Sequence, residues 1–256
     1  MTVSGGKDAD ATLRTIALRL EYDGTRFAGW QRQDGQRTVQ GEIEAAIERI
    51  VGERATVHGS GRTDAGVHAL GQVASFRART RIGAAEIGRA LSAMLPEDIA
   101  VLGAWEADAD FHARFGAASK VYRYRVLNRR ERSAIDRAFS HRVAAPLDLD
   151  AMRAAAAVLL GRHDFRAFCT EATSRNDTVR TVSRLDLERR GDYIVVEIEA
   201  DGFLYNMVRS IVGTLLLVGT AKMSVDAFRN VFLSRDRRRA GPTAPARGLF
   251  LVEVRY

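Results

Sequence analysis

Several features are scarce or absent in this sequence of 256 residues, and each absence argues against one class of protein. A single cysteine, Cys169, excludes an intramolecular disulfide framework and favours a reducing compartment. The opening stretch, MTVSGGKDADAT, has no apolar core of the kind that a signal peptide needs. The most apolar window, 202–221, contains Asn206 and Arg209, which favours a buried helix over a membrane span. We therefore expect a cytoplasmic protein without a membrane segment.

The motifs of metal and nucleotide sites are missing as well. The histidines are scattered and form no His-x-x-x-His pair, and one cysteine cannot complete a zinc site. There is no phosphate-binding loop ending in Gly-Lys-Ser/Thr, no Gly-x-Gly-x-x-Gly fingerprint and no Gly-x-Ser-x-Gly elbow. We expect no metal and no cofactor, so any chemistry must come from side chains.

Size and charge narrow the class further. A hydrophobic fraction of 46% over this length is ample for one large domain or two coupled ones. The net charge of +7, from 39 basic and 32 acidic residues, favours a polyanionic partner. Basic residues gather at 128–132 and 235–239, although such runs are usually solvated loops. The charge therefore favours nucleic acid as a partner without requiring it.

Hydrophobic periodicity predicts an α+β chain made of two related lobes that share a sheet. Strands are expected at 15–22, 54–58, 70–77, 99–105, 119–127, 179–188, 193–200 and 248–256. Helices are expected from a cap at Thr38 to Ile50 and at 83–94, 149–160, 204–219 and 224–233. No linker rich in Pro, Gly or Ser separates the halves, which predicts a tight junction. We expect a disordered tail at 1–13, an N-terminal lobe at 14–114 and a C-terminal lobe at 115–256.

One short stretch stands out, GSGRTDAGVHALGQ at 59–72, which places Arg62 and Asp64 between glycines. Glycine lets the backbone turn sharply or approach a ligand closely. An ordinary turn with a capping Asp would explain an isolated carboxylate. The neighbouring guanidinium favours a second interpretation, because it is always charged and can hold a carboxylate in its ionised form.

Two other residues are candidates for the same site. Arg209 is the one charged residue in the window 202–221, and a buried cation needs an anionic partner such as Asp64 or a phosphate. It could instead extend to solvent at a sheet edge. Tyr122 lies on an apolar strand face, where an aromatic residue is usually part of the core, but its hydroxyl needs a partner if buried.

Taken together, the motifs resemble the TruA-type tRNA pseudouridine synthases. The resemblance rests on six blocks in family order, LEYDGTRFAGWQRQ, GRTDAGVHALGQV, DFHARFGAASKVYRYRV, HDFRAF, DGFLYNMVRSIVGTLL and APARGLFLVEV. They cover nearly all of residues 15–256, and no motif position departs from the pattern.

The resemblance implies isomerisation of uridine to pseudouridine at positions 38 to 40 of the tRNA anticodon stem-loop. It also implies a homodimer of two-lobed subunits with a mostly antiparallel central sheet, helices on one side and a basic cleft between the lobes. The family uses no metal or organic cofactor.

The resemblance assigns roles to individual residues. Asp64 matches the catalytic carboxylate, Tyr122 the active-site tyrosine that stacks on the uracil, and Arg209 the arginine that pairs with the carboxylate. Arg62 would contact phosphate or fill the space that the flipped uridine leaves. We also expect Arg26, Arg32 and the run 237–239 to contact the RNA.

The sequence leaves the chemical route open between attack of Asp64 on C1′, addition to C6 and a promoted elimination. Two other functions are alternatives. An RNA-binding protein without activity explains the charge but not a carboxylate beside two arginines. A metal-free hydrolase or glycosidase would need a second carboxyl group, and no partner for Asp64 stands out.

Overall fold

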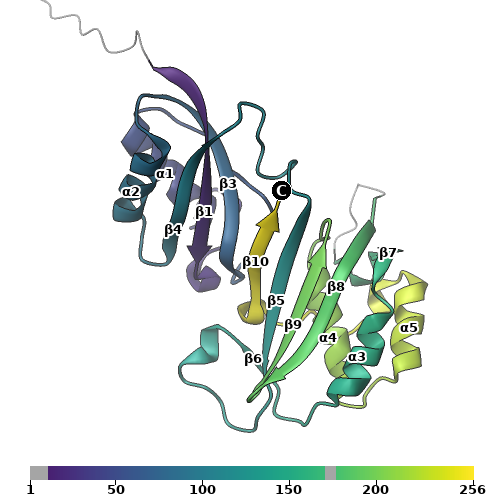
Figure 1. The fold of residues 1–256 in the computed structure, drawn as a ribbon. Coiled ribbons are helices and arrows are strands. Elements are labelled where there is room, and N and C mark those ends of the chain that lie inside the picture. Colours follow the sequence, from purple (N-terminus) through teal and green to yellow (C-terminus); the bar gives the residue numbers. More distant parts are fainter. Residues whose placement is uncertain (1–10, 171–176) are drawn as a thin grey trace, which may run out of the picture.

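The computed structural model describes residues 11–170 and 177–256, and the ten strands within them form one sheet (Figure 1). The strands are β1 (Thr12–Tyr22), β2 (His58–Gly59), β3 (His68–Thr80), β4 (Ile99–Ala107), β5 (Ser119–Leu127), β6 (His141–Arg142), β7 (Gly161–Asp164), β8 (Val179–Arg190), β9 (Tyr193–Ala200) and β10 (Leu249–Arg255). Their order is β4-β1-β3-β10-β5-β9-β8-β7, with β2 beside β3 and β6 beside β5. Two described pairings, β10 with β3 and β5 with β6, are parallel and the others are antiparallel.

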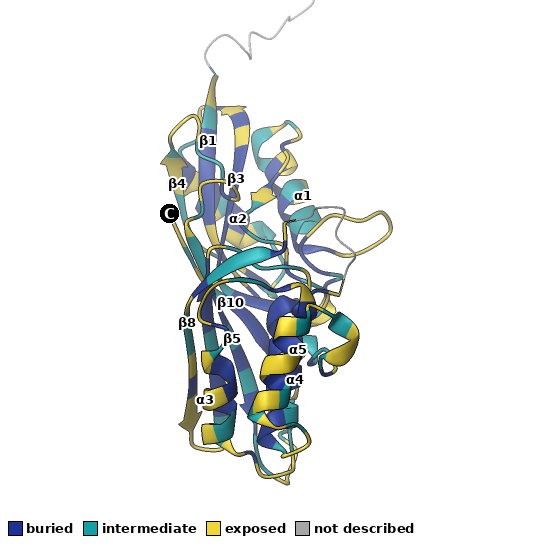
Figure 2. Cartoon of the chain, turned by 90° about the vertical axis from the view of Figure 1, so that its right-hand side faces the viewer, coloured by how far each residue is buried: buried dark blue, intermediate teal, exposed yellow. Residues whose placement is uncertain are grey.

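The helices cover one side of this sheet (Figure 2). Their bounds are α1 (Val39–Val51), α2 (Ala84–Met94), α3 (Leu149–Ala157), α4 (Met207–Gly219) and α5 (Val225–Ser234). The first two cover the N-terminal half of the sheet and the other three cover the C-terminal half (Figure 1). This is the expected α+β architecture of two lobes on a mostly antiparallel sheet. No helix in the described ranges is long and apolar enough to cross a membrane.

The last strand of the chain joins the two halves of the sheet. β10 lies between β3 and β5, with Phe250 opposite His68 on one side and Leu251 opposite Tyr122 on the other. His68 is buried and adds a second link, because its Nε2 lies 3.0 Å from the carbonyl oxygen of Ala138. The C-terminal strand therefore makes the two halves one continuous sheet.

Local sequence explains where helices begin and end. The Thr38 hydroxyl accepts a hydrogen bond from the Gly41 amide at 3.3 Å, and Gly52 ends α1 with a φ of +85°. Helix α4 is buried over most of its surface, which is why the window 202–221 is so apolar. A Cβ at Gly213 would lie 1.8 Å from the carbonyl oxygen of Pro242, so only glycine fits this helix contact.

Most expected elements are present, and 119–127 and 193–200 match β5 and β9 end to end. The strand expected at 54–58 is wrong, because a strand forms only at His58–Gly59 and the Val57 amide donates to Glu44 Oε1. Helix α3 ends at Ala157 rather than at residue 160. β1 begins at Thr12, two residues before the expected start of the N-terminal lobe, and residues 1–10 of the expected tail lie outside the described residues.

Candidate active site

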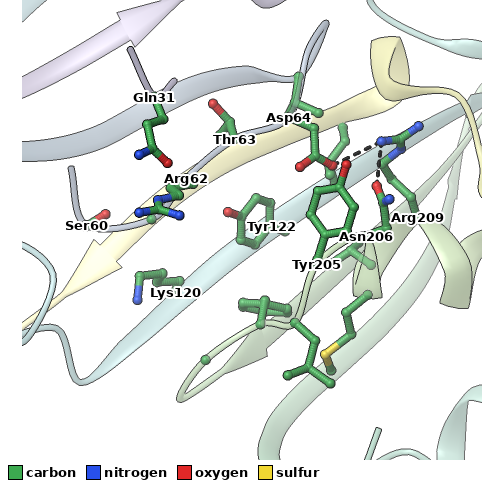
Figure 3. Close-up of a pocket in the computed structure, with 18 of the residues that line it drawn as sticks. Gln31, Ser60, Arg62, Thr63, Asp64, Lys120, Tyr122, Tyr205, Asn206 and Arg209 are labelled. Atoms are coloured by element: carbon green, nitrogen blue, oxygen red, sulfur yellow. Dashed lines mark hydrogen bonds and ion pairs between the residues drawn. The ribbon is translucent and has the colours of Figure 1, made fainter. Parts of the chain in front are cut away.

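A cleft of about 860 Å³ opens where the loop 60–67, strand β5 and the segment 202–209 meet (Figure 3). Its charged lining residues are Arg62, Asp64, Arg114, Lys120, Arg180 and Arg209. Asp64 is the one carboxylate among these described lining residues, so the cleft is strongly cationic. A cationic cleft attracts polyanions and concentrates them near the carboxylate.

The loop that carries Asp64 is held by the segment that follows β1. The Trp30 amide donates to the Thr63 carbonyl at 2.9 Å, and the Tyr22 and Thr63 hydroxyls are 2.8 Å apart. Gly29 has a φ of +105°, and a Cβ there would lie 2.7 Å from the Thr63 carbonyl oxygen. The close approach therefore requires glycine, and the loop backbone is fixed before any substrate binds.

A buried amide fixes the start of the same loop. Gln72 is fully buried, and its Nε2 donates to the Gly61 carbonyl at 2.8 Å while its Oε1 accepts from the Ser60 hydroxyl at 2.6 Å. Burial makes these hydrogen bonds costly to break. Gln72 lies in the motif GSGRTDAGVHALGQ, but the motif predicted no role for it. A polar residue inside an otherwise apolar strand was the signal that could have identified it.

Asp64 and Arg209 form the ion pair that was expected of them. Arg209 Nη1 lies 3.0 Å from Asp64 Oδ2, and the two side chains are 18% and 22% exposed respectively. Arg209 also donates from Nε to the Ala244 carbonyl at 2.8 Å and from Nη1 to Asn206 Oδ1 at 2.7 Å. These contacts orient the guanidinium, and its charge favours the ionised carboxylate.

Asn206 was not predicted as a site residue, yet it holds Arg209 in place. It precedes α4 with a φ of +59°, a left-handed conformation that Asn tolerates better than most residues. Its Nδ2 donates to the Thr170 hydroxyl at 2.7 Å, which leaves Oδ1 facing Arg209. The one sequence signal was its place immediately before an apolar helix.

Tyr122 is buried, at 7% exposure, and its ring stands edge-on to Phe203 with centroids 4.8 Å apart. Burial raises the pKa of its hydroxyl well above the usual range, and Tyr22 and Asp64 raise it further. The phenol is therefore protonated at neutral pH. Figure 3 shows its ring between Asp64 on one side and Arg62 and Lys120 on the other. It can stack on a base and exchange a proton within the cleft.

The other predicted RNA contacts divide into two groups. Arg62 is exposed and lines the cleft. Arg26 and Arg32 are exposed outside the described lining, and Arg32 pairs with Glu44 at 3.2 Å. The run 237–239 also lies outside that lining. The roles of these residues in RNA binding stay predictions.

Three glycines lie near Asp64 in the sequence, Gly59, Gly61 and Gly66, and of these Gly61 lines the cleft. Gly59 instead packs on Trp30, where a Cβ would lie 2.5 Å from the indole ring. Gly66 has a φ of +75°, so it serves the turn after Asp64. Two of these glycines are thus explained by the loop itself rather than by access for a ligand.

Comparisons with known proteins identify relatives over most of the chain. A family model described as "tRNA pseudouridine synthase" matches residues 19–116 and 155–256. The chain is 47% identical to the tRNA pseudouridine synthase A of Acetivibrio thermocellus and 48% identical to that of Brevibacillus brevis. Each alignment covers 95% of this chain and 100% of the relative. A solved archaeal box H/ACA Nop10–Cbf5 complex overlaps 93% of this chain and 71% of its own, with a TM-score of 0.38 and 14% identity, too weak a likeness to carry an argument.

Proposed function

The chain belongs to the tRNA pseudouridine synthase family and is an isomerase that acts on tRNA, and from this premise we propose its site and its catalytic group. It converts uridine to pseudouridine at positions 38 to 40 of the anticodon stem-loop, and Asp64 is the catalytic carboxylate. It works as a cytoplasmic homodimer without metal or organic cofactor. The isomerisation of uridine in tRNA rests on family membership. The tRNA positions, the role of Asp64, the compartment, the dimer and the lack of a cofactor rest on the site and the sequence resemblance.

The proposed reaction rearranges bonds within one nucleotide. The N1–C1′ bond breaks, the uracil turns while it is held, and a C5–C1′ bond forms. The proton on C5 is lost and N1 gains one, so that no atom or electron is added or removed. The target uridine must first leave the base stack to reach the cleft. A carboxylate is suited to this reaction because it can form a covalent intermediate or stabilise a cationic sugar.

The observation that supports the proposal most strongly is the Asp64–Arg209 pair inside a cationic cleft. A carboxylate there repels phosphate, so a protein that only bound RNA would gain affinity by losing it. Three hydrogen bonds to Arg209 hold its guanidinium beside Asp64. Such positioning is what a reactive carboxylate needs.

The neighbouring residues take the remaining roles. Tyr122 stacks on the uracil and takes part in proton transfer, because its buried hydroxyl stays protonated. Arg62 contacts the backbone or occupies the space left by the flipped uridine, and its exposed position in the lining supports this role. Arg26 and Arg32 contact phosphates away from the cleft.

The test is Asp64→Asn with an unmodified tRNA under enzyme excess, followed by mapping of pseudouridine. Wild-type protein is expected to modify uridines at positions 38 to 40. The Asn variant is nearly isosteric but neither anionic nor nucleophilic, so product should fall to background. Its tRNA affinity should hold or rise, because one negative charge has left a cationic cleft.

Two outcomes would contradict the proposal. Substantial turnover by the Asn variant would exclude Asp64 as the catalytic group. It would instead indicate that Asp64 caps a turn, a role that Asn fills about as well as Asp. Product confined to uridines outside the anticodon stem-loop would refute the assigned position while leaving the enzyme class intact.

A further inference from the structure

The cleft contains a lysine in a chain that relies on arginine almost everywhere else. The lysines of the sequence are Lys7, Lys120 and Lys222. Lys120 lies on β5, two residues before Tyr122, and both side chains line the cleft. Residues at i and i+2 of a strand point to the same face, roughly 6–7 Å apart. The ammonium group of Lys120 and the phenol of Tyr122 therefore lie on one continuous surface of the cleft.

The surroundings of Lys120 are short of negative charge. Its stem passes along the backbone of Gly61, where a Cβ would lie 3.5 Å from Lys120 Cε. Burial lowers the pKa of the ammonium, and the charges of Arg114 and Arg180 lower it further. Asp201 acts in the opposite direction, but no carboxylate in the described part of the chain forms an ion pair with Lys120. The Asp201 Oδ1 instead accepts the Thr181 amide at 3.0 Å.

The arginines that face Lys120 come from separate elements. Arg180 is on β8 and lies across Gly202, where a Cβ would be 3.0 Å from its Nε. Its Nη1 lies 3.4 Å from Asp177, a largely exposed carboxylate that gives only weak compensation. Arg114 lies in the segment before β5 and also lines the cleft. The charges of both arginines disfavour the ammonium form of Lys120, and a bound anion would offset this repulsion.

We propose that Lys120, together with Arg114 and Arg180, binds a phosphate of the RNA strand next to the target uridine. This inference rests on the proposed function, because it takes the uracil to lie against Tyr122. Only a sugar separates a base from its phosphates. A uracil held against Tyr122 therefore brings a phosphate toward Lys120, which lies two residues away on the same face of β5. Lys120 thus fixes the nucleotide backbone while the uracil turns.

The choice of lysine has a physical consequence. An ammonium can lose its proton in a cationic pocket, whereas a guanidinium stays charged throughout the accessible pH range. A bound phosphate favours the protonated form of Lys120 by supplying the missing negative charge. Binding of the phosphate is therefore linked to the protonation of this one side chain.

The first test measures tRNA affinity as a function of pH with Asp64→Asn as the parent, so that no turnover occurs. As the pH rises toward the ordinary pKa of a lysine, the parent should lose affinity, because Lys120 loses its proton in the free protein below that value. Added Lys120→Arg should flatten this dependence relative to the parent, because the guanidinium stays charged. Titration of the RNA bases affects both proteins equally and cancels in the comparison.

The second comparison removes the charge of Lys120. Lys120→Gln should weaken tRNA binding about tenfold and reduce the slope of log affinity against log salt by about 0.7–0.9, as expected for one phosphate contact. Lys222→Gln is the matched control, because Lys222 is exposed and lies outside the described lining of the cleft. It should change neither quantity beyond the small effect of one surface charge.

A third measurement uses the protein with all three lysines intact. Acylation of amines, read by peptide mass spectrometry, should modify Lys120 in the free protein and be blocked by bound tRNA, with Lys222 as the internal reference. Equal modification with and without tRNA, or a Lys120→Gln variant that matches Lys222→Gln, would overturn the inference. Either result could occur while wild-type protein still forms pseudouridine at positions 38 to 40, so the failure of this inference is distinct from that of the proposed function.

Discussion

At the residue scale, the site depends on how Arg209 is held rather than on the presence of charge alone. Its guanidinium contacts Asp64, Asn206 and the Ala244 carbonyl, which come from three separate segments of the chain. A lysine could offer only one compact charge at this point and would not match the planar arrangement of these acceptors. The guanidinium beside the carboxylate is thus fixed from several directions before substrate enters.

Arg209→Ala is expected to impair stability and catalysis together. The substitution leaves a partly buried carboxylate without this partner, at a cost of about 3 kcal/mol in the free energy of unfolding. Chemical denaturation of Arg209→Ala, Asp64→Ala and the double variant would measure their coupling. Strictly additive effects on stability would contradict a direct interaction that matters for the fold.

Tyr122→Phe isolates the hydroxyl, because the ring and its contact with Phe203 survive. If the hydroxyl takes part in proton transfer, the single-turnover rate should fall by roughly 10²-fold or more while tRNA binding persists. Stability should change little, since no hydrogen bond of this hydroxyl anchors the described core. Wild-type rates in the Phe variant would show that Tyr122 acts as a packing and stacking residue only.

At the scale of elements, the catalytic loop takes its shape from the segment after β1. Trp30 and Gly29 contact the loop backbone, and the buried Gln72 holds its first residues from β3. None of these groups carries chemistry. Their effect is to remove conformational freedom from the loop 60–67, so that binding energy is not spent on ordering it.

Gly29→Ala should damage this arrangement, and Gly35→Ala provides a matched control. Both glycines have positive φ, at +105° and +70°, so each substitution carries backbone strain on the order of 1–2 kcal/mol. A Cβ at Gly29 meets the Thr63 carbonyl oxygen, whereas a Cβ at Gly35 meets nothing within 4 Å. Thermal unfolding should show a larger loss of stability for Gly29→Ala than for Gly35→Ala. The single-turnover rate should fall for Gly29→Ala and stay near the wild-type rate for Gly35→Ala. Equal behaviour of the two variants would contradict the role of Gly29 in placing the loop.

At the scale of the whole molecule, the site exists because the two halves share one sheet. Asp64 comes from the N-terminal half and Arg209 from the C-terminal half, 145 residues later. Strand β10 lies between β3 and β5 and closes the sheet where the two halves meet. Any loosening of this junction would separate the ion pair, so the stability of the fold and the activity are coupled.

The cationic surface of the molecule predicts a steep dependence of tRNA binding on salt. Each neutralised phosphate releases counterions, so log affinity should fall linearly with log salt concentration. Arg62→Gln, in the cleft, and Arg32→Gln, outside its described lining, should each lower the slope by about 0.7–0.9 if both residues contact phosphate. An affinity that stays flat as salt rises several-fold would contradict an interface dominated by phosphate contacts. A lower slope for Arg62→Gln but not for Arg32→Gln would indicate that the phosphate contacts lie within the cleft.

The sequence by itself determined the elements whose hydrophobic pattern is complete within a short window. Strands 119–127 and 193–200 and the helix capped by Thr38 follow from periodicity and capping, because these depend on neighbours in the chain. Those rules failed at 54–58, where the Val57 amide bonds to Glu44, a partner from a helix. Six motif blocks in order also identified the family, because their coincidence is specific.

Only the tertiary structure decided which distant residues meet. Spacing alone left the partner of Arg209 open between Asp64 and a phosphate, the family resemblance implied Asp64, and the fold brings the two side chains to 3.0 Å. The sequence assigned no role to Asn206, Gln72 or Lys120, since the importance of each depends on atoms from other elements. The reason is physical: periodicity reports which face of an element is buried, whereas hydrogen bonds and charge pairs depend on how the faces are brought together.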